Sequence, residues 1–256
     1  MSRIGDAFAR AKAEGRTALI CYAMGGDPSL KATEALLRAI DYAGADVIEL
    51  GLPFSDPIAD GPVLQAAAVR ALAAGATLRK LFELASFLEL KAPLVAMGYM
   101  NPIESMGLAA FAQAAGRSGI AGVIVPDLPL EEAQPLRDLL AEQGVELVPL
   151  VAPTSGAERA AAIAKSARGF LYTVSVTGVT GAQVSLPGDL AERLRDLRAI
   201  SPVPVAVGFG ISTPEQAAGL KGLADGVVVG SALVAAHHAG GVAAAAELVR
   251  TLRAAL

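Results

Sequence analysis

Several residue types on which catalytic sites often depend are scarce in this chain of 256 residues. It contains one cysteine, Cys21, two adjacent histidines, His237 and His238, and no tryptophan. A lone cysteine cannot form an internal disulfide and has no histidine partner, so we expect a reduced, cytoplasmic protein without a thiol nucleophile. The two histidines follow the last apolar run of the chain, which places them poorly for a central base or a metal cluster.

Long hydrophobic runs and clustered charges are missing as well. Hydrophobic residues make up 54% of the chain, but many are alanine, and no uninterrupted run is long enough to span a bilayer. The first fifteen residues, with Asp6, Lys12 and Glu14, predict an amphipathic helix and not a signal peptide. The net charge is −4 and the 21 basic residues are scattered, so we expect neither a nucleic-acid nor a membrane partner.

The positions of the lysines argue against Schiff-base chemistry. All of them fall in predicted helices or directly before predicted strands, and none follows a strand, where a Schiff base would be needed. This argues against a lysine-dependent aldolase. The six are Lys12, Lys31, Lys80, Lys91, Lys165 and Lys221.

Strand-like and helix-like segments alternate eight times along the chain without a break in composition. The short apolar runs cover residues 18–22, 47–50, 94–99, 123–125, 147–151, 170–174, 203–207 and 227–229. Between them lie helix-period segments such as 30–42, 130–142 and 190–200, and the gap after the second run holds two, 63–74 and 78–90. This pattern predicts a single (β/α)₈ TIM barrel with extra helices over residues 1–256. A doubly wound open sheet is the alternative, but the turn Met24–Pro28 lacks its glycine fingerprint.

The stretch VIELGLPFSDPIADG, residues 47–61, is the most informative part of the sequence. Glu49 lies inside an apolar run that predicts a buried strand, and acids are rarely buried without a reason. Asp60 follows in a loop rich in proline, as does Asp56. The alternative is that Glu49 is a satisfied core acid and that the aspartates form turns, which for Asp56 is an equal explanation. With histidine, lysine and cysteine set aside, Glu49 and Asp60 remain for proton transfer, and Asp127 is a third acid.

In a barrel, function lies at the carboxyl ends of the strands. Three of the four tyrosines and one phenylalanine fall there, which suits a flat apolar ligand, although Tyr99 is also explained as a cap on the barrel core. These aromatic residues are Tyr22, Tyr99, Tyr172 and Phe209. Glycine and serine follow the seventh and eighth strands, as Gly210-Ile-Ser and Gly230-Ser231. Main-chain amides and a helix start at these two positions favour a phosphate site.

Taken together, these residues resemble the tryptophan synthase alpha subunit family. The segment from Ile48 to Gly61 matches the signature of the family without a gap, and the likeness runs nearly end to end. Further matching segments are 26–28, 99–102, 126–129, 178–181, 208–211 and 230–231. The resemblance implies a barrel lyase of tryptophan biosynthesis that cleaves indole-3-glycerol phosphate by a retro-aldol reaction into indole and D-glyceraldehyde 3-phosphate. It also implies a pyridoxal-phosphate beta subunit in an α₂β₂ heterotetramer, with no cofactor and no metal in this chain.

The resemblance also assigns roles to residues of this sequence. The catalytic pair of the family falls on Glu49 and Asp60. Its phosphate ligands fall on Gly181, Gly210, Gly230 and Ser231, and its indole pocket on Tyr22, Tyr172 and Phe209. Thr180 matches the loop residue of the family that closes over the acidic loop, and Asp56, Pro57 and Asn101 match positions that face the beta subunit. Gln183 stands where a basic residue is common, which puts the rate of loop closure and coupling to the partner in doubt.

The bond to be broken suggests a mechanism for the two acids. Glu49 would protonate C3 of the indole and accept the proton of the glycerol hydroxyl, with its pKa raised by an apolar setting. Asp60 would stay ionised and hold the indole N–H. Two alternatives remain: another phosphate-handling barrel enzyme, such as an isomerase or aldolase, and a catalytically silent barrel that only activates a partner.

Overall fold

Parallel strands alternate with helices in the computed structural model, which describes residues 2–174, 189–208 and 210–256. The strands are β1 (Ala18–Met24), β2 (Val47–Gly51), β3 (Leu94–Met97), β4 (Gly122–Ile124), β5 (Glu146–Val148), β6 (Leu150–Val151), β7 (Leu171–Val174), β8 (Val205–Gly208) and β9 (Gly226–Val229). The helices are α1 (Arg3–Ala13), α2 (Leu30–Ala43), α3 (Pro62–Ala73), α4 (Leu78–Ser86), α5 (Met100–Met106), α6 (Leu108–Arg117), the 3₁₀ turn η1 (Leu130–Glu132), α7 (Gln134–Glu142), α8 (Ala157–Ser166), α9 (Leu190–Ile200), α10 (Pro214–Ala218) and α11 (Ser231–Ala255).

The nine strand segments form a barrel of eight strands, because two of the segments, β5 and β6, belong to one strand. The sheet runs in the order β5-β4-β3-β2-β1-β9-β8-β7-β6, and every neighbouring pair is parallel. Its two outer members, β5 and β6, are consecutive in the chain and are separated only by Pro149. Proline has no N–H to donate, but its carbonyl accepts a hydrogen bond of 3.1 Å from the backbone of Tyr172. Residues 146–151 therefore act as one strand of the barrel, which pairs with β4 on one side and with β7 on the other. The predicted barrel is confirmed.

Several predicted elements have other bounds in the structure. The predicted helix 78–90 ends at Ser86, and the predicted strand 203–207 begins at Val205. Two further differences have a visible cause. The expected helix 130–142 is divided into η1 and α7, because Pro135 lacks an N–H and fits only the first turn of a helix. The expected strand 94–99 ends at Met97, since Tyr99 is the N-cap of α5 and the Asp127 carboxylate accepts the N–H of Met100 at 3.0 Å. The predicted helices 30–42 and 190–200 correspond to α2 and α9.

Alternation along the strands divides the buried side chains into two layers. Successive residues of a strand point to opposite faces of the sheet. In β1, Leu19 and Cys21 join the cluster between the sheet and the helices, whereas Ile20 and Tyr22 join the cluster inside the barrel. In β2 the outer cluster holds Ile48 and Leu50, so that residue 49 between them faces the barrel interior.

The helix α11 is the one described helix that by length and composition alone could cross a membrane. Its backbone is broken at Gly241, where φ is 68° and ψ is −163°, so it consists of two shorter segments. Each segment buries part of its apolar side chains against the barrel, among them Leu233, Val249 and Leu252. These positions of the helix therefore belong to the hydrophobic core.

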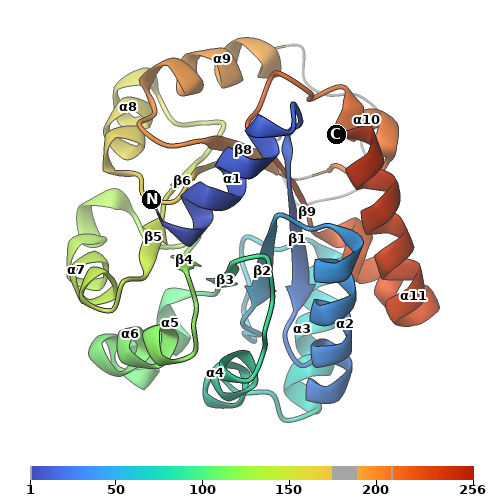
Figure 1. Ribbon diagram of the computed structural model, residues 1–256. Coiled ribbons are helices and arrows are strands. Elements are labelled where there is room, and N and C mark those ends of the chain that lie inside the picture. The colour runs from blue at the N-terminus through green and yellow to red at the C-terminus, as the bar shows by residue number, and fades with distance from the viewer. Residues whose placement is uncertain (1, 175–188, 209) are drawn as a thin grey trace.

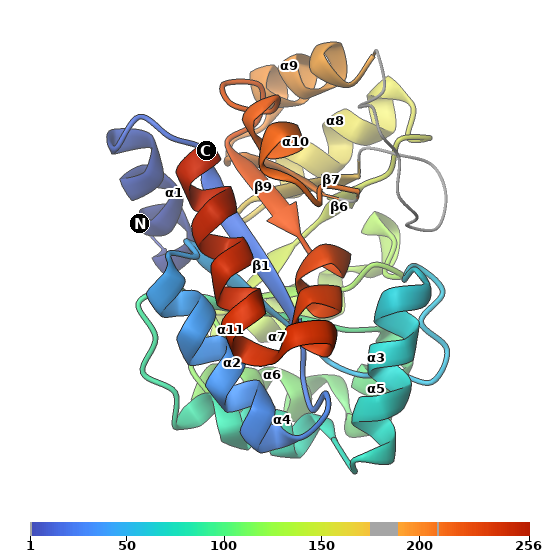
Figure 2. The same ribbon diagram turned by 90° about the vertical axis from the view of Figure 1, so that its right-hand side faces the viewer.

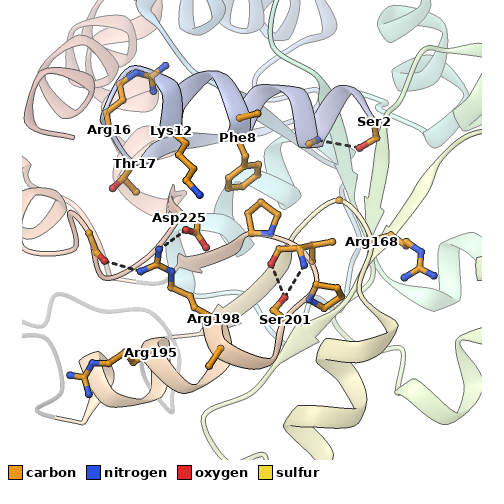
Figure 3. A pocket seen from close by; sticks show the side chains of 18 of the residues that line it. Ser2, Phe8, Lys12, Arg16, Thr17, Arg168, Arg195, Arg198, Ser201 and Asp225 are labelled. Carbon is orange, nitrogen blue, oxygen red and sulfur yellow. Dashed lines mark hydrogen bonds and ion pairs between the residues drawn. The ribbon is translucent and has the colours of Figure 1, made fainter.

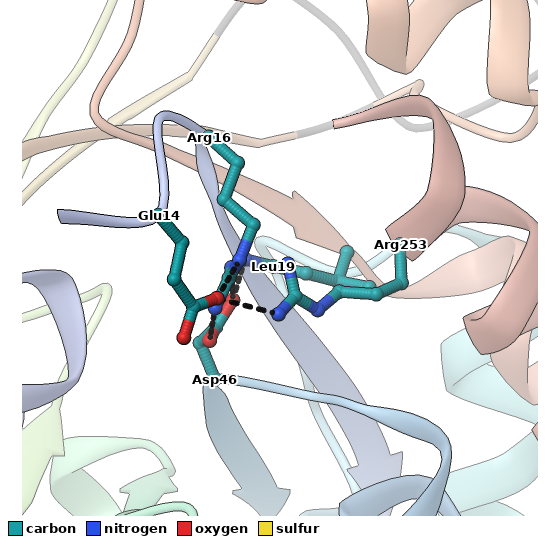
Figure 4. A network of polar contacts seen from close by, with 5 residues as sticks. All are labelled: Glu14, Arg16, Leu19, Asp46 and Arg253. Atoms are coloured by element: carbon teal, nitrogen blue, oxygen red, sulfur yellow. Dashed lines mark hydrogen bonds and ion pairs between the residues drawn. The ribbon is translucent and has the colours of Figure 1, made fainter. Parts of the chain in front are cut away.

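The two mouths of the barrel are covered differently. The helix α1 lies across the end at which the strands begin (Figure 1), and α3 lies toward the opposite end (Figure 2). At the amino-terminal end, Arg16 forms a two-pronged ion pair with Asp46 at 2.6 and 2.8 Å, and Asp46 also accepts the N–H of Leu19. Glu14 adds contacts to Arg16 and to Arg253 of α11 (Figure 4). This network ties α1, β1 and α11 together and leaves the carboxyl-terminal mouth free for a site.

Candidate active site

Glu49 projects from β2 into the barrel interior, with 1% of its surface exposed. Its Oε1 atom is buried and has no hydrogen-bond partner among the residues that the structure describes. Because burial disfavours the charged form, the pKa of this carboxyl is raised from 4.5 to about 8. Glu49 is therefore mainly protonated at neutral pH and can both donate and accept a proton near that pH. Among the described residues, this unpaired oxygen argues against a satisfied core acid.

Asp60 closes the loop between β2 and α3 and is 4% exposed. Its backbone N–H donates to the carbonyl of Pro57 at 3.0 Å, and its carbonyl accepts from Nε2 of Gln65 at 2.9 Å. Burial raises the pKa of its carboxyl to about 6, and a hydrogen bond from Tyr99 opposes that rise. Asp60 is therefore predominantly ionised at neutral pH, unlike Glu49.

Tyr99 holds the loop that carries Asp60. Its hydroxyl accepts the N–H of Ala59 at 3.2 Å and donates to the carboxylate of Asp60. Its ring lies 5.5 Å, centroid to centroid, from that of Phe54 on the same loop. From the sequence, Tyr99 was explained either as a pocket residue or as a cap on the barrel core. Its contact with Asp60 was not predicted. The one available signal was its place at the end of the third strand.

Two further tyrosines form the floor of the site. Tyr22 is the register partner of Glu49 on the neighbouring strand, and Tyr172 lies on β7; each is 4% exposed. Burial raises the pKa of both phenols far above the ordinary value. Glycine is required opposite each ring, because a Cβ at Gly51 or Gly208 would overlap the hydroxyl group of Tyr22 or Tyr172.

A cavity of about 250 Å³ opens beside Glu49 at the carboxyl ends of the strands. Its wall includes both acids and both tyrosines, and its apolar part is formed by α3, β3, β9 and α11. The lining residues are Tyr22, Glu49, Asp60, Val63, Leu64, Met97, Tyr172, Gly210, Ile211, Ser212, Val228, Gly230, Ser231, Ala232 and Ala235. The structure thus brings together seven of the residues that the sequence singled out.

One wall of this cavity suits an anion. Gly210 has a φ of +85°, which favours glycine, and a Cβ there would meet no atom within 4 Å. Ser231 is the first residue of α11, where the backbone N–H groups at the start of a helix have no helical acceptor. Gly230 precedes it, and its carbonyl accepts from Leu233 and Val234. The start of a helix, two glycines and one hydroxyl-bearing residue therefore form this wall, a combination that suits a phosphate group.

The remaining predicted positions are less informative. Asp56 and Asn101 are exposed, whereas Pro57 is buried. Ile58, which follows Pro57 in the same loop, is 78% exposed. Gly181, Thr180, Gln183 and Phe209 lie outside the described residues, so their predicted roles stay predictions. Within residues 2–174, 189–208 and 210–256, no group of three or more His, Cys, Asp or Glu side chains could hold a metal ion.

Comparison with known proteins gives the family. The family model described as "Tryptophan synthase alpha chain" matches residues 8–254. The chain belongs to the tryptophan synthase alpha chain family. A relative from Synechococcus elongatus with that name is 49% identical over 259 residues, which cover 100% of this chain and 97% of the relative. One from Carboxydothermus hydrogenoformans is 50% identical over 236 residues, which cover 91% of this chain and 88% of the relative.

Solved structures agree with the sequence comparison. The structure of Mycobacterium tuberculosis tryptophan synthase in space group F222 superimposes with a TM-score of 0.93 at 38% identity, covering 99% of this chain and 98% of that one. A structure from Aquifex aeolicus VF5 gives a TM-score of 0.91 at 37% identity, covering 100% of this chain and 99% of that one. The predicted fold, family and enzyme class are thus confirmed: the chain is a carbon–carbon lyase of tryptophan biosynthesis.

Proposed function

We propose that the cavity beside Glu49 binds indole-3-glycerol phosphate and cleaves it, with Glu49 as the acid and base. The protonated carboxyl of Glu49 transfers its proton to C3 of the indole, and the ring then carries positive charge. The resulting carboxylate accepts the proton of the adjacent glycerol hydroxyl. The carbon–carbon bond breaks, its electron pair returns to the indole ring, and the aldehyde forms. Glu49 ends protonated, as it began.

Asp60 would stabilise the charge that develops in this sequence. Its lower pKa, about 6 against about 8 for Glu49, keeps it ionised while Glu49 is protonated. A carboxylate at the indole N–H offsets the positive charge on the protonated ring in a site that excludes water. Two neighbouring acids in different protonation states are the arrangement that acid–base chemistry of this kind requires.

The phosphate of the substrate would bind at the amide wall formed by Gly210, Gly230 and Ser231, with Gly181 as a further ligand. Tyr22, Tyr172 and Phe209 would enclose the indole ring. The single observation that supports this orientation most strongly is the common cavity, since it has two acids at one wall and free helix-start amides at the other. Thr180 would close its loop over the site once substrate is bound.

The partner proposed for this chain is a beta subunit that receives the indole. Asp56, Pro57 and Asn101 would face it in an α₂β₂ heterotetramer, and pyridoxal phosphate would reside in that partner. The exposed side chain of Ile58, beside Pro57, supports an interface at this mouth, because large apolar side chains exposed in a functional loop often mark binding surfaces. We further propose one domain, residues 1–256, in the cytoplasm.

The deciding experiment is steady-state cleavage of indole-3-glycerol phosphate by the isolated chain, with and without a beta subunit. Glu49→Gln and Asp60→Asn variants are expected to fold and bind substrate but to lose ~10²–10⁴-fold in rate, the usual contribution of a positioned acid or base. Glu83→Gln, an exposed acid on α4, is the matched control and should keep full activity. Turnover of triose or ribulose phosphates in place of this substrate would favour another barrel enzyme. No turnover of any of them would indicate a silent barrel.

A further inference from the structure

Another cavity lies at the opposite mouth of the barrel and has no place in the proposed reaction. It encloses about 940 Å³ between α1 and the loops that precede β7, β8 and β9 (Figure 3). On one side, Ser2, Gly5, Phe8 and Lys12 lie along one face of α1. On the other side are residues of α9 and of the loops 201–204 and 221–225. This cavity is separate from the active site, with which it shares no lining residue.

The wall of this cavity is strongly basic, although the chain as a whole carries a net charge of −4. Six basic and two acidic side chains line it. Of the basic ones, Arg16 pairs with Asp46 and Arg198 pairs with Asp225 at 2.9 Å. Within the described part of the chain the other four have no ion-pair partner: Lys12, Arg168, Arg195 and Lys221. A concave surface lined by unpaired charges of one sign concentrates ions of the opposite sign.

The same wall contains an unsatisfied hydrogen-bond acceptor. Oε1 of Glu146 accepts the N–H of Gly169 at 3.1 Å, but Oε2 is buried and has no donor among the described residues. A buried acceptor without a donor is costly, and a hydroxyl group of a ligand would satisfy it once the side chain of Glu146, which lines the cavity, turns toward the ligand. Gly169, the donor to Glu146, follows Arg168 in the chain, and Glu146 and Arg168 both line this wall, so a donor and an anionic group of one ligand would meet them in the same part of it. Phe8 and Pro202 add apolar surface.

We propose that this amino-terminal cavity binds a small organic phosphate that carries hydroxyl groups, such as a sugar bisphosphate. Its phosphate groups would bind the unpaired cations, which lie on both sides of the cavity: Lys12 on α1, and Arg168 and Lys221 on the loops. A hydroxyl group would donate to Glu146. A ligand in this position contacts both α1 and the loops before β7 and β9. Because these segments come together only in the folded chain, the ligand stabilises that state, and the stabilisation grows with the logarithm of its concentration once it exceeds Kd.

The test is titration of the full chain with D-fructose 1,6-bisphosphate at low ionic strength, followed by calorimetry and by amide NMR. Saturable binding is expected, with shifts at Lys12, Gly169 and Gly222. Lys12→Glu should weaken binding at least about tenfold, because it reverses a charge close to the phosphate. Lys31→Glu makes the same change on the exposed surface of α2, at the other end of the barrel, and should stay within about twofold of the parent.

Two results would overturn the proposal. One is a set of shifts confined to residues 210–212 and 230–235, which would place the probe only in the active site. The other is equal affinity of the Lys12→Glu and Lys31→Glu variants. Hexane-1,6-diyl bisphosphate, which has two phosphates and no hydroxyl group, tests the role of Glu146. It should bind more weakly than the sugar, and Glu146→Gln should narrow that difference; equal binding of both probes to the parent chain would refute the hydroxyl assignment.

Discussion

Replacing Glu49 by glutamine should stabilise the protein at alkaline pH while it lowers activity ~10²–10⁴-fold. In the folded chain the pKa of Glu49 is about 8, against 4.5 for an unperturbed glutamate. Above pH 4.5 the unfolded chain releases a proton that the folded chain keeps, so this residue makes folding progressively less favourable as the pH rises toward 8. At 1.36 kcal/mol per pH unit, the penalty reaches roughly 5 kcal/mol, which is an upper value because it assumes complete burial.

The assay is urea unfolding of the parent and of Glu49→Gln between pH 5 and pH 9. Glutamine has nearly the same shape and does not titrate. The difference in unfolding free energy, variant minus parent, should therefore increase by several kcal/mol from pH 5 to pH 9. Glu83→Gln, on the surface of α4, should show no such gain. A difference between parent and Glu49→Gln that does not change with pH would refute the raised pKa, and with it the role of Glu49 as a resting acid.

Three other results are expected from the same geometry. The pH dependence of kcat/KM should be bell-shaped with limbs near pH 6 and pH 8, since Asp60 must be ionised and Glu49 protonated; a flat profile over this range would contradict the assignment. Tyr99→Phe should lower kcat/KM by roughly 10- to 100-fold, as expected for a hydrogen bond to a charged group. It should also move the acid limb to higher pH, because the phenol lowers the pKa of Asp60; an unmoved limb would show that the contact is absent during turnover. Gly51→Ala should cost about 1–3 kcal/mol in urea unfolding, because the methyl group would displace the ring of Tyr22, and an unchanged midpoint would show that the ring can move freely.

The sequence predicted those features that depend on local pattern. Alternating strand and helix periods indicated the barrel, and the single carboxylate inside the apolar run of β2 indicated an inward acid. Both were confirmed, because the pleat of a strand fixes which side chains face inward once their neighbours pack outward. The boundaries of elements were less predictable. Pro135 divides the predicted helix 130–142, and Pro149 divides the predicted strand 147–151.

Contacts between distant segments could not be predicted from the sequence. The hydroxyl of Tyr99 reaches Ala59 across 40 positions of the chain, and this depends on how the loop after β2 folds over the end of β3. The side chain of Gln65 likewise holds the carbonyl of Asp60 only once α3 has begun. Neither side chain has a local pattern that distinguishes it from a core tyrosine or a surface glutamine.

The order of the proton transfers follows from the depth at which each acid is buried. Glu49 is enclosed by the barrel and has no donor at Oε1 among the described residues, so it rests in the neutral form and must act first as an acid. Asp60 is at the rim, where Tyr99 donates to it, so it rests as an anion and can only attract positive charge or accept a proton. A chain in which the two pKa values were exchanged would have the same residues in the same cavity but would begin with no proton to deliver to the ring. The barrel therefore contributes to the chemistry through the difference in solvation that it imposes on the two carboxylates, at the expense of stability near and above neutral pH.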